Sequence, residues 1–161
     1  MSAVSFKYDP FGRRIYKSSS SGTSIYACDD NGNLIEEANS AGTAVARYSQ
    51  GLNIDEPLAM LRSSTTSYYD ADGLGSITSL SSGAGSLAQT YTFDSFGKLT
   101  NSSGSLINPF QYTAREFDTE TSLYYYRARY YDSAIEPFVS EDLRLPRKTV
   151  NHNLGEELPT E

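Results

Sequence analysis

A repeated turn signature constrains the fold of this chain more than any other feature. The pattern Asp-x-x-Gly follows an aromatic residue or a cysteine and begins at Asp9, Asp29, Asp70 and Asp94. Its spacing is roughly 20 residues or a multiple of that, the length of two short strands and two turns. The Asp side chain can accept hydrogen bonds from amides ahead of it, and Gly supplies the positive φ that closes a tight turn. Each copy therefore predicts a strand, a turn and a second strand.

A second series of glycines punctuates the chain between these turns, at Ser21-Gly22, Ala41-Gly42, Gly83-Ala84-Gly85 and Ser103-Gly104. The two series together predict an all-β chain of repeated antiparallel β-hairpins forming a twisted strip. Such repeats bury their apolar faces only against neighbours, so we expect an open first strand that associates. The third period lacks an Asp turn, and its Pro57 predicts an edge strand or a bend. No stretch has helical periodicity.

The densest aromatic stretch runs from Leu123 to Asp132 and holds two arginines among its tyrosines. Aromatic residues favour strands, so it predicts one strand with Arg127 and Arg129 on the same face. A hairpin turning near residues 119–122 would set Glu116 opposite Arg127, within a row of alternate acids. This favours an ion-pair ladder. A platform of Arg and Tyr that binds nucleic acid is disfavoured. The chain has 20 Asp and Glu against 13 Lys and Arg, and this negative net charge repels phosphate.

Composition limits the remaining classes of function. With Cys28 as the single cysteine, the chain has neither an intrachain disulfide nor a Cys-His zinc cluster. No apolar run reaches the length of a signal peptide or a membrane span, so we expect no membrane insertion. Export would need another part of a larger chain or a dedicated secretion machine. Residues 143–161 contain no aromatic side chain and predict a polar, disordered tail.

The ordered set of motifs resembles the RHS or YD-repeat family, and the C-terminal half is similar to the RHS repeat-associated core domain. The similarity covers residues 6–142, which suggests repeats and core over 1–142 and a tail over 143–161. The segments that carry it are Glu56–Met60, Tyr68–Ile77, Tyr91–Gly97, Asn108–Asp118 and Leu123–Asp132.

The resemblance implies a spiralling strip of hairpins that closes, at full length, into a hollow shell. In RHS polymorphic toxins and insecticidal toxin complexes the shell encloses a C-terminal toxin; in teneurins it serves adhesion at the cell surface. It also implies a secreted or cell-surface location. The core domain closes one end of the shell, and in many members it cuts the chain after itself by an aspartyl-protease-like reaction.

The sequence departs from the family pattern near that cut. Ser133 follows Asp132, Glu136-Pro137-Phe138 replaces Gly-Arg-Phe, Leu143 follows Asp142, and the Gly-rich plug is absent. Two turns also carry Ala114 and Ser122 where the family commonly has Gly, so we expect strain in both turns.

Candidate site residues each have a simpler interpretation. Asp142 matches one of two carboxylates needed for self-cleavage, but no second one is found. His152 lies in the expected tail and is interpreted as solvated. Asp29–Gly32 and Asp70–Gly73 resemble calcium loops but lack the distal Glu, so turn chemistry is preferred. Cys28 occupies an aromatic position of the repeat, which indicates a small packed residue and not a nucleophile.

The glycines at Gly73–Ser76 lack the Lys and the helix of a phosphate loop. We therefore expect no catalytic, cofactor-binding or metal-binding residue and no cofactor. The predicted function is a non-catalytic shell segment whose partners are the rest of an RHS shell or a C-terminal toxin. Two alternatives are a module that binds carbohydrate or a cell-surface partner through an exposed Tyr-rich sheet, and an autoproteolytic core acting through Asp142.

Overall fold

The computed structural model describes residues 3–135 and 138–139. Ten strands form one antiparallel sheet in sequence order. They are β1 (Ser5–Tyr8), β2 (Arg14–Ser19), β3 (Gly22–Cys28), β4 (Leu34–Asn39), β5 (Ala44–Gln50), β6 (Pro57–Arg62), β7 (Thr65–Ala71), β8 (Ile77–Ser82), β9 (Leu87–Phe93) and β10 (Leu99–Gly104). The prediction of an all-β hairpin strip is confirmed.

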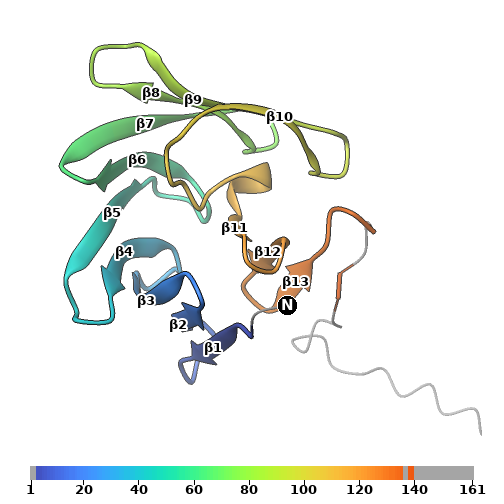
Figure 1. The fold of residues 1–161 in the computed structure, drawn as a ribbon. Helices are drawn as coiled ribbons and strands as arrows, with labels where there is room; N and C mark the ends of the chain where they lie inside the picture. The colour runs from blue at the N-terminus through green and yellow to red at the C-terminus, as the bar shows by residue number, and fades with distance from the viewer. Residues whose placement is uncertain (1–2, 136–137, 140–161) are drawn as a thin grey trace, which may run out of the picture.

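The strip curls into an open arc, and the chain then turns inside it (Figure 1). A 3-10 turn, η1 (Tyr112–Ala114), leads to a three-stranded inner sheet of β11 (Glu116–Asp118), β12 (Leu123–Tyr126) and β13 (Arg129–Tyr131). No helix within the described residues is long and apolar enough to cross a membrane. The predicted tail at 143–161, with Asp142 and His152, lies outside these residues.

Local hydrogen bonds explain the Asp turns. At Asp9, Asp72 and Asp94 a carboxylate oxygen accepts the amides two and four residues ahead, at 2.9–3.0 Å. At each turn the Gly three residues on donates to the Asp carbonyl. The third copy therefore begins at Asp72, and the prediction of Asp70 was wrong. The positive φ falls at Gly75, so Asp70 stays inside β7, where it accepts the Ser79 hydroxyl.

The turns at the opposite ends of the strands use the same template with other side chains. Asn39 and Ser82 accept the amides ahead of them, and Gly42 and Gly85 close these two turns. The amide oxygen of asparagine and the hydroxyl of serine can also accept hydrogen bonds from these amides, and the Asp-x-x-Gly pattern did not include them. The expected hairpin at Ser103-Gly104 does not form, because β10 ends the sheet there.

Pro57 begins a strand that lies inside the sheet, between β5 and β7, so the predicted edge or bend was wrong. Proline has no N–H to donate to a neighbouring strand, but the first residue of a strand does not need to donate one, so proline is tolerated there.

The predicted single strand from Leu123 to Asp132 is a tight hairpin instead. Arg127 has φ 59° and Ala128 donates to the Tyr126 carbonyl, so β12 and β13 fold back on one another. The expected turn at residues 119–122 is present, but Glu116 pairs with Tyr125 and not with Arg127.

The apolar core lies between the concave face of the strip and the segment that enters the arc. Its members are fully or nearly buried and include Leu34, Met60, Ile77 and Leu80. Phe110 inserts among the strip tyrosines, with its ring centroid 5.2 Å from that of Tyr48. The core therefore depends on a contact between the first hundred residues and the segment that follows them.

Candidate functional site

Five loops lie along one edge of the strip, because every second turn of an antiparallel ribbon falls on the same side. We call this edge the Asp-turn rim; it comprises residues 9–13, 29–33, 51–56, 72–76 and 94–98. Residues 105–131, here the closing segment, make hydrogen bonds to every one of these loops. This contact is the candidate functional site.

The loop after β9 is held by three tyrosine hydroxyls. They donate to consecutive carbonyls, from Tyr112 to Ser95 at 3.0 Å, from Tyr131 to Phe96 at 2.9 Å and from Tyr124 to Gly97 at 2.9 Å. Gly97 has φ +83°, and a Cβ there would lie 2.3 Å from the Tyr112 ring. A glycine is therefore required where the closing segment meets the rim.

The closing segment also contacts the loops at residues 9–13 and 72–76. Tyr125 donates its hydroxyl to the Gly12 carbonyl at 3.3 Å and accepts the Arg14 amide at 3.1 Å. At the Asp72 turn, Thr113 donates its amide to Ser76, 3.0 Å away. The tyrosines that suggested an exposed platform are therefore turned onto the strip.

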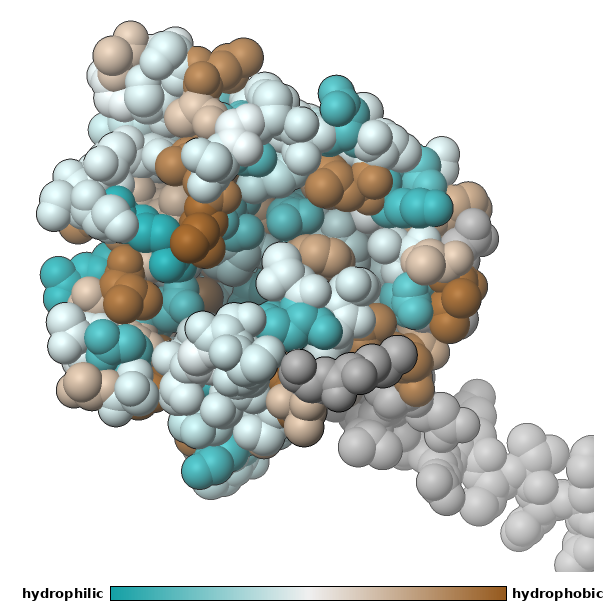
Figure 2. Space-filling model, in the orientation of Figure 1, coloured by the Kyte–Doolittle hydropathy of each residue, from teal (hydrophilic) through white to brown (hydrophobic). Residues whose placement is uncertain are grey.

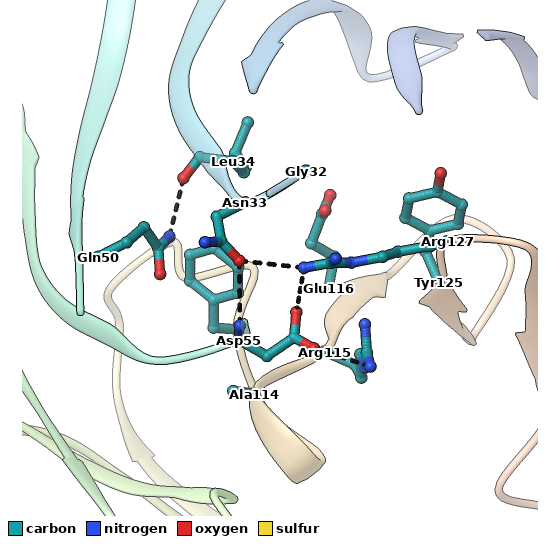
Figure 3. Close-up of a pocket in the computed structure, with 11 residues that line it drawn as sticks. Gly32, Asn33, Leu34, Gln50, Asp55, Ala114, Arg115, Glu116, Tyr125 and Arg127 are labelled. Carbon is teal, nitrogen blue, oxygen red and sulfur yellow. Dashed lines mark hydrogen bonds and ion pairs between the residues drawn. The ribbon is translucent and has the colours of Figure 1, made fainter. Parts of the chain in front are cut away.

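The remaining two loops converge on Asp55 (Figure 3). Arg127 donates to the Asn31 carbonyl at 2.8 Å, the Asn33 amide oxygen at 3.0 Å and Asp55 at 2.8 Å. Arg115 contacts the other Asp55 oxygen at 2.7 Å. Burial lowers the pKa of Arg115 and neighbouring Arg127 adds to this, while Asp55 opposes both. Asp55 thus joins the closing segment to the loop between β5 and β6.

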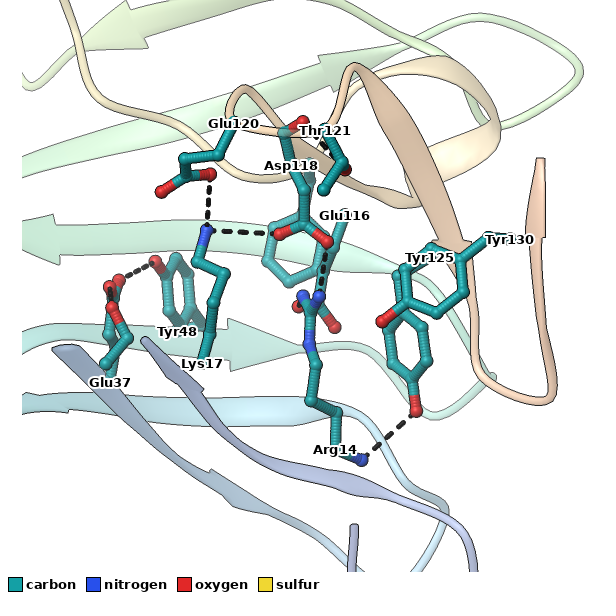
Figure 4. Close-up of polar contacts among 12 residues, drawn as sticks. Arg14, Lys17, Glu37, Tyr48, Glu116, Asp118, Glu120, Thr121, Tyr125 and Tyr130 are labelled. Carbon is teal, nitrogen blue, oxygen red and sulfur yellow. Dashed lines mark hydrogen bonds and ion pairs between the residues drawn. The ribbon is translucent and has the colours of Figure 1, made fainter. Parts of the chain in front are cut away.

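A buried ion cluster lies beneath the rim (Figure 4). Arg14 of β2 contacts Asp118 and Glu116, and Lys17 lies 3.1 Å from both Asp118 and Glu120. Burial alone would lower the pKa of Arg14, but Glu116 and Asp118 outweigh it and hold that pKa well above its usual range. The acids do share one face, as expected.

The partners of these acids are cations of β2, so the predicted ladder with Arg127 and Arg129 was wrong. The hairpin at Arg127 turns the two arginines away from the acid row. Arg127 reaches the rim, and the Arg129 guanidinium lies 3.7 Å from the Phe138 ring centroid. Sequence reasoning missed Arg14, Lys17 and Asp55. The signal that would have indicated Arg14 and Lys17 is their position on the concave face, opposite the acid row.

The other candidates are placed as follows. Cys28 is half-buried, and burial raises the pKa of its thiol to about 11, so it stays protonated at neutral pH. Asp29 makes turn hydrogen bonds to Asn33. In the part of the chain that the structure describes, no group of three His, Cys, Asp or Glu side chains could hold a metal. Asp142 and His152 lie outside the described residues.

Comparison with known proteins identifies the shell architecture. The family model for the teneurin YD-shell matches residues 1–161. The tRNA3(Ser)-specific nuclease WapA of Bacillus spizizenii is 28% identical over 143 residues, which cover 86% of this chain and 6% of the relative. The tRNA nuclease WapA of Bacillus subtilis (strain 168) has the same identity and coverage. The chain thus spans only a small part of these curated relatives.

Solved structures share the fold at low identity. A crystal structure of TcdB2-TccC3-TEV matches with TM-score 0.67 and 18% identity, over 87% of this chain and 8% of that chain. The Tc holotoxin pore of Photorhabdus luminescens matches with TM-score 0.68 and 17% identity, over 92% of this chain and 8% of the other. The predicted RHS/YD resemblance is confirmed: this chain belongs to the teneurin YD-shell family.

Proposed function

We propose that this chain is a non-catalytic wall segment that closes one end of a YD shell, and that the complete shell encloses a toxin polypeptide. The observation that carries the proposal is the contact of residues 105–131 with all five loops of the Asp-turn rim. A segment that holds every loop of one edge fixes the curvature of the strip there and blocks that end of the arc.

Two further observations support this proposal over the alternatives. Relatives are named as tRNA nucleases and neighbours as Tc toxin, yet this chain spans 6% to 8% of them, so we assign their activities to the parts that it does not match. The tyrosines of the Leu123–Asp132 stretch bind rim loops or pack against other rings, which leaves them unsuited to holding a glycan. We further propose that the enclosed toxin acts outside the producing cell.

A graft tests the closing role. The matching segment of a WapA relative is replaced by this chain, and protease resistance of the polypeptide inside the shell is followed over time. We expect protection by the wild-type graft and its loss with Arg127→Ala, which removes contacts to two loops. Arg47→Ala is the matched control, since the ion pair of Arg47 with Glu36 is exposed and lies away from the Asp-turn rim. Equal digestion with and without the graft would contradict the proposal.

Catalysis is tested on the purified chain. Incubated with total tRNA beside a full-length WapA relative, the chain should leave the tRNA intact. Its intact mass after long incubation at several pH values should also stay unchanged, which bears on the predicted role of Asp142. Cleaved tRNA or a shortened chain would show that the segment is an enzyme.

A further inference from the structure

Figure 2 shows the molecule hollowed between the curled strip and the inner sheet. The charged side chains that line this hollow pair with one another, for example Arg14 with Glu116 and Arg62 with Glu37. These groups are therefore satisfied within the chain. A reactive amide lies on the Asp-turn rim instead, at Asn31.

Asn31 differs from the residues at the equivalent position of the other Asp turns. Two positions after the turn Asp and directly before the turn Gly, the other copies carry Phe11, Leu74 and Phe96. Asn31 is exposed, and its side-chain amide makes no hydrogen bond to a described residue. It lines a surface cavity of about 370 Å³. The amide is therefore free to react and within reach of water.

The residue that follows makes Asn31 chemically labile. Asn31-Gly32 is the single Asn-Gly pair in the sequence. An asparagine amide can react with the backbone nitrogen of the next residue, and glycine has no side chain to block the approach. Every other asparagine precedes a residue with a side chain, and Asn108 precedes a proline, whose nitrogen carries no hydrogen. Asn31 is thus the asparagine of this chain best placed for that reaction.

Arg127 contacts the peptide group that would react. Its Nη1 donates to the Asn31 carbonyl at 2.8 Å, and this carbonyl and the Gly32 nitrogen belong to one peptide unit. The nitrogen must lose its proton before it attacks, and the negative charge spreads onto the carbonyl oxygen. A guanidinium held against that oxygen stabilises the charge, as the donors of an oxyanion hole do. The Gly32 N–H also donates to the Asp29 carbonyl at 3.0 Å, so attack requires this turn bond to open.

We propose that Asn31 is a site of spontaneous deamidation and that Arg127 promotes the reaction. The Gly32 nitrogen bonds to Cγ of Asn31, and the side-chain nitrogen leaves as ammonia with the proton that Gly32 gave up, so that a succinimide ring forms. Water then opens the ring to aspartate or isoaspartate. Either product places a new carboxylate in the cavity that Arg13 and Arg127 line. The modification would thus alter the contact between the closing segment and residues 29–33 as the protein ages.

Mass spectrometry tests the proposal on the whole folded chain, digested after incubation at mildly alkaline pH. We expect the peptide that contains Asn31 to exchange its amide for a carboxylate, with part of the product recognised by protein isoaspartate methyltransferase. The rate should fall at mildly acidic pH, because the Gly32 nitrogen must lose its proton. Asn101, exposed and followed by serine, is the internal reference. An Asn31 that reacts no faster than Asn101 would overturn the proposal.

Matched variants test the role of Arg127. Leu74→Asn creates a second Asn-Gly pair in the Asp72 turn, where the glycine has the same φ of +80° but Arg127 makes no contact. We expect Asn31 to react about threefold to tenfold faster than the introduced asparagine, the value of one hydrogen bond. Asn31→Leu should abolish the reaction and keep the fold, since Leu74 occupies the same position of its own turn. Melting temperatures show whether each variant folds. Equal rates at the two positions, or a reaction that persists in Asn31→Leu, would overturn the proposal.

Discussion

Left-handed backbone gathers in the closing segment. Thr113, Ala114, Ser122 and Arg127 have φ between 48° and 60°, although none of them is glycine. Such conformations cost an L-residue about 1–2 kcal/mol each. The expectation of strain at Ala114 and Ser122 is confirmed. The segment makes these tight turns to direct its side chains to the rim, and the contacts made there must offset the strain.

Ser122→Gly should stabilise the protein by about 1 kcal/mol, because Ser122 is exposed and glycine adopts its φ of 60° without strain. Urea unfolding measures the change. Ser49→Gly is the control, at an exposed position in the extended strand β5, and it should lose about 0.5–1 kcal/mol. Destabilisation by Ser122→Gly would show that the turn is not strained.

Gly97→Ala and Gly85→Ala separate backbone strain from steric contact. Both glycines have φ near +80°, but nothing lies within 4 Å of a Cβ at Gly85, whereas one at Gly97 meets the Tyr112 ring. Gly85→Ala should lower the free energy of unfolding by about 1 kcal/mol. Gly97→Ala should lower it by at least about 2 kcal/mol more, because the new methyl group displaces that ring. Equal losses in thermal unfolding would show that the closing segment does not rest on this loop.

At the scale of elements, the acid row of β11 and its turn meets the cations of β2. Arg14 and Asp118 are each at most 3% exposed, so neither has water as an alternative partner. A buried pair of this kind adds little net stability, but removing one member leaves an uncompensated charge. The pair therefore specifies how the inner sheet is aligned on the strip.

Asp118→Ala should destabilise the chain by at most about 3–5 kcal/mol, because Arg14 loses the more buried of its two acidic partners and keeps Glu116. The double variant Arg14→Met with Asp118→Leu should recover part of this loss, since both members of the buried pair are removed together; Lys17 keeps Glu120, while Glu116 loses its contact with Arg14. Denaturant unfolding of the two single variants and the double variant measures the coupling. Additive losses would mean that the two side chains act independently.

The whole molecule is an open arc that ends in the edge strands β1 and β10, each of which has one side that pairs with no other described strand of the sheet. All six residues of β10 are exposed and uncharged, and it contains no proline. Natural edge strands usually carry a charge or a proline that blocks pairing. The predicted association through the first strand is thus better placed at β10, because β1 has Lys7 and packs Phe6 and Tyr8 against the inner sheet.

Asn101→Lys on β10 should reduce concentration-dependent association in analytical ultracentrifugation, since a charge opposes edge pairing. Ser49→Lys is the control, because it adds the same charge to an interior strand. A wild-type chain that stays monomeric at all concentrations would contradict this.

Alkaline pH should unfold the molecule as a whole. Burial raises the pKa of tyrosines in both layers, among them Tyr26, Tyr48, Tyr124 and Tyr125. Each of these tyrosines contributes fully to the free energy of unfolding below its unfolded-state pKa of about 10. Above that pH the contribution falls by about 1.4 kcal/mol per pH unit for each tyrosine.

Tyr26→Phe isolates one such group, because the Tyr26 hydroxyl makes no hydrogen bond to a described residue. The free energy of unfolding near pH 7 should equal that of the wild type. Its fall between pH 10 and 11 should be smaller than in the wild type by about 1 kcal/mol. Urea unfolding across this range provides the measurement. An unchanged slope would show that the phenol is not protected from ionisation.

The sequence by itself determined the hairpin strip. Asp9, Asp29 and Asp94 bond to amides at most four residues away, so their turns are written in the local pattern. The third turn was misplaced by two residues because Asp70 and Asp72 each precede a glycine at the same spacing, and only backbone φ distinguishes them. Only the tertiary structure decided where the closing segment goes. The partners of Arg127 lie 72 to 96 residues away, and a tight turn at that residue reverses the face expected from alternation. Such contacts depend on the curvature of the whole strip, which no local spacing records.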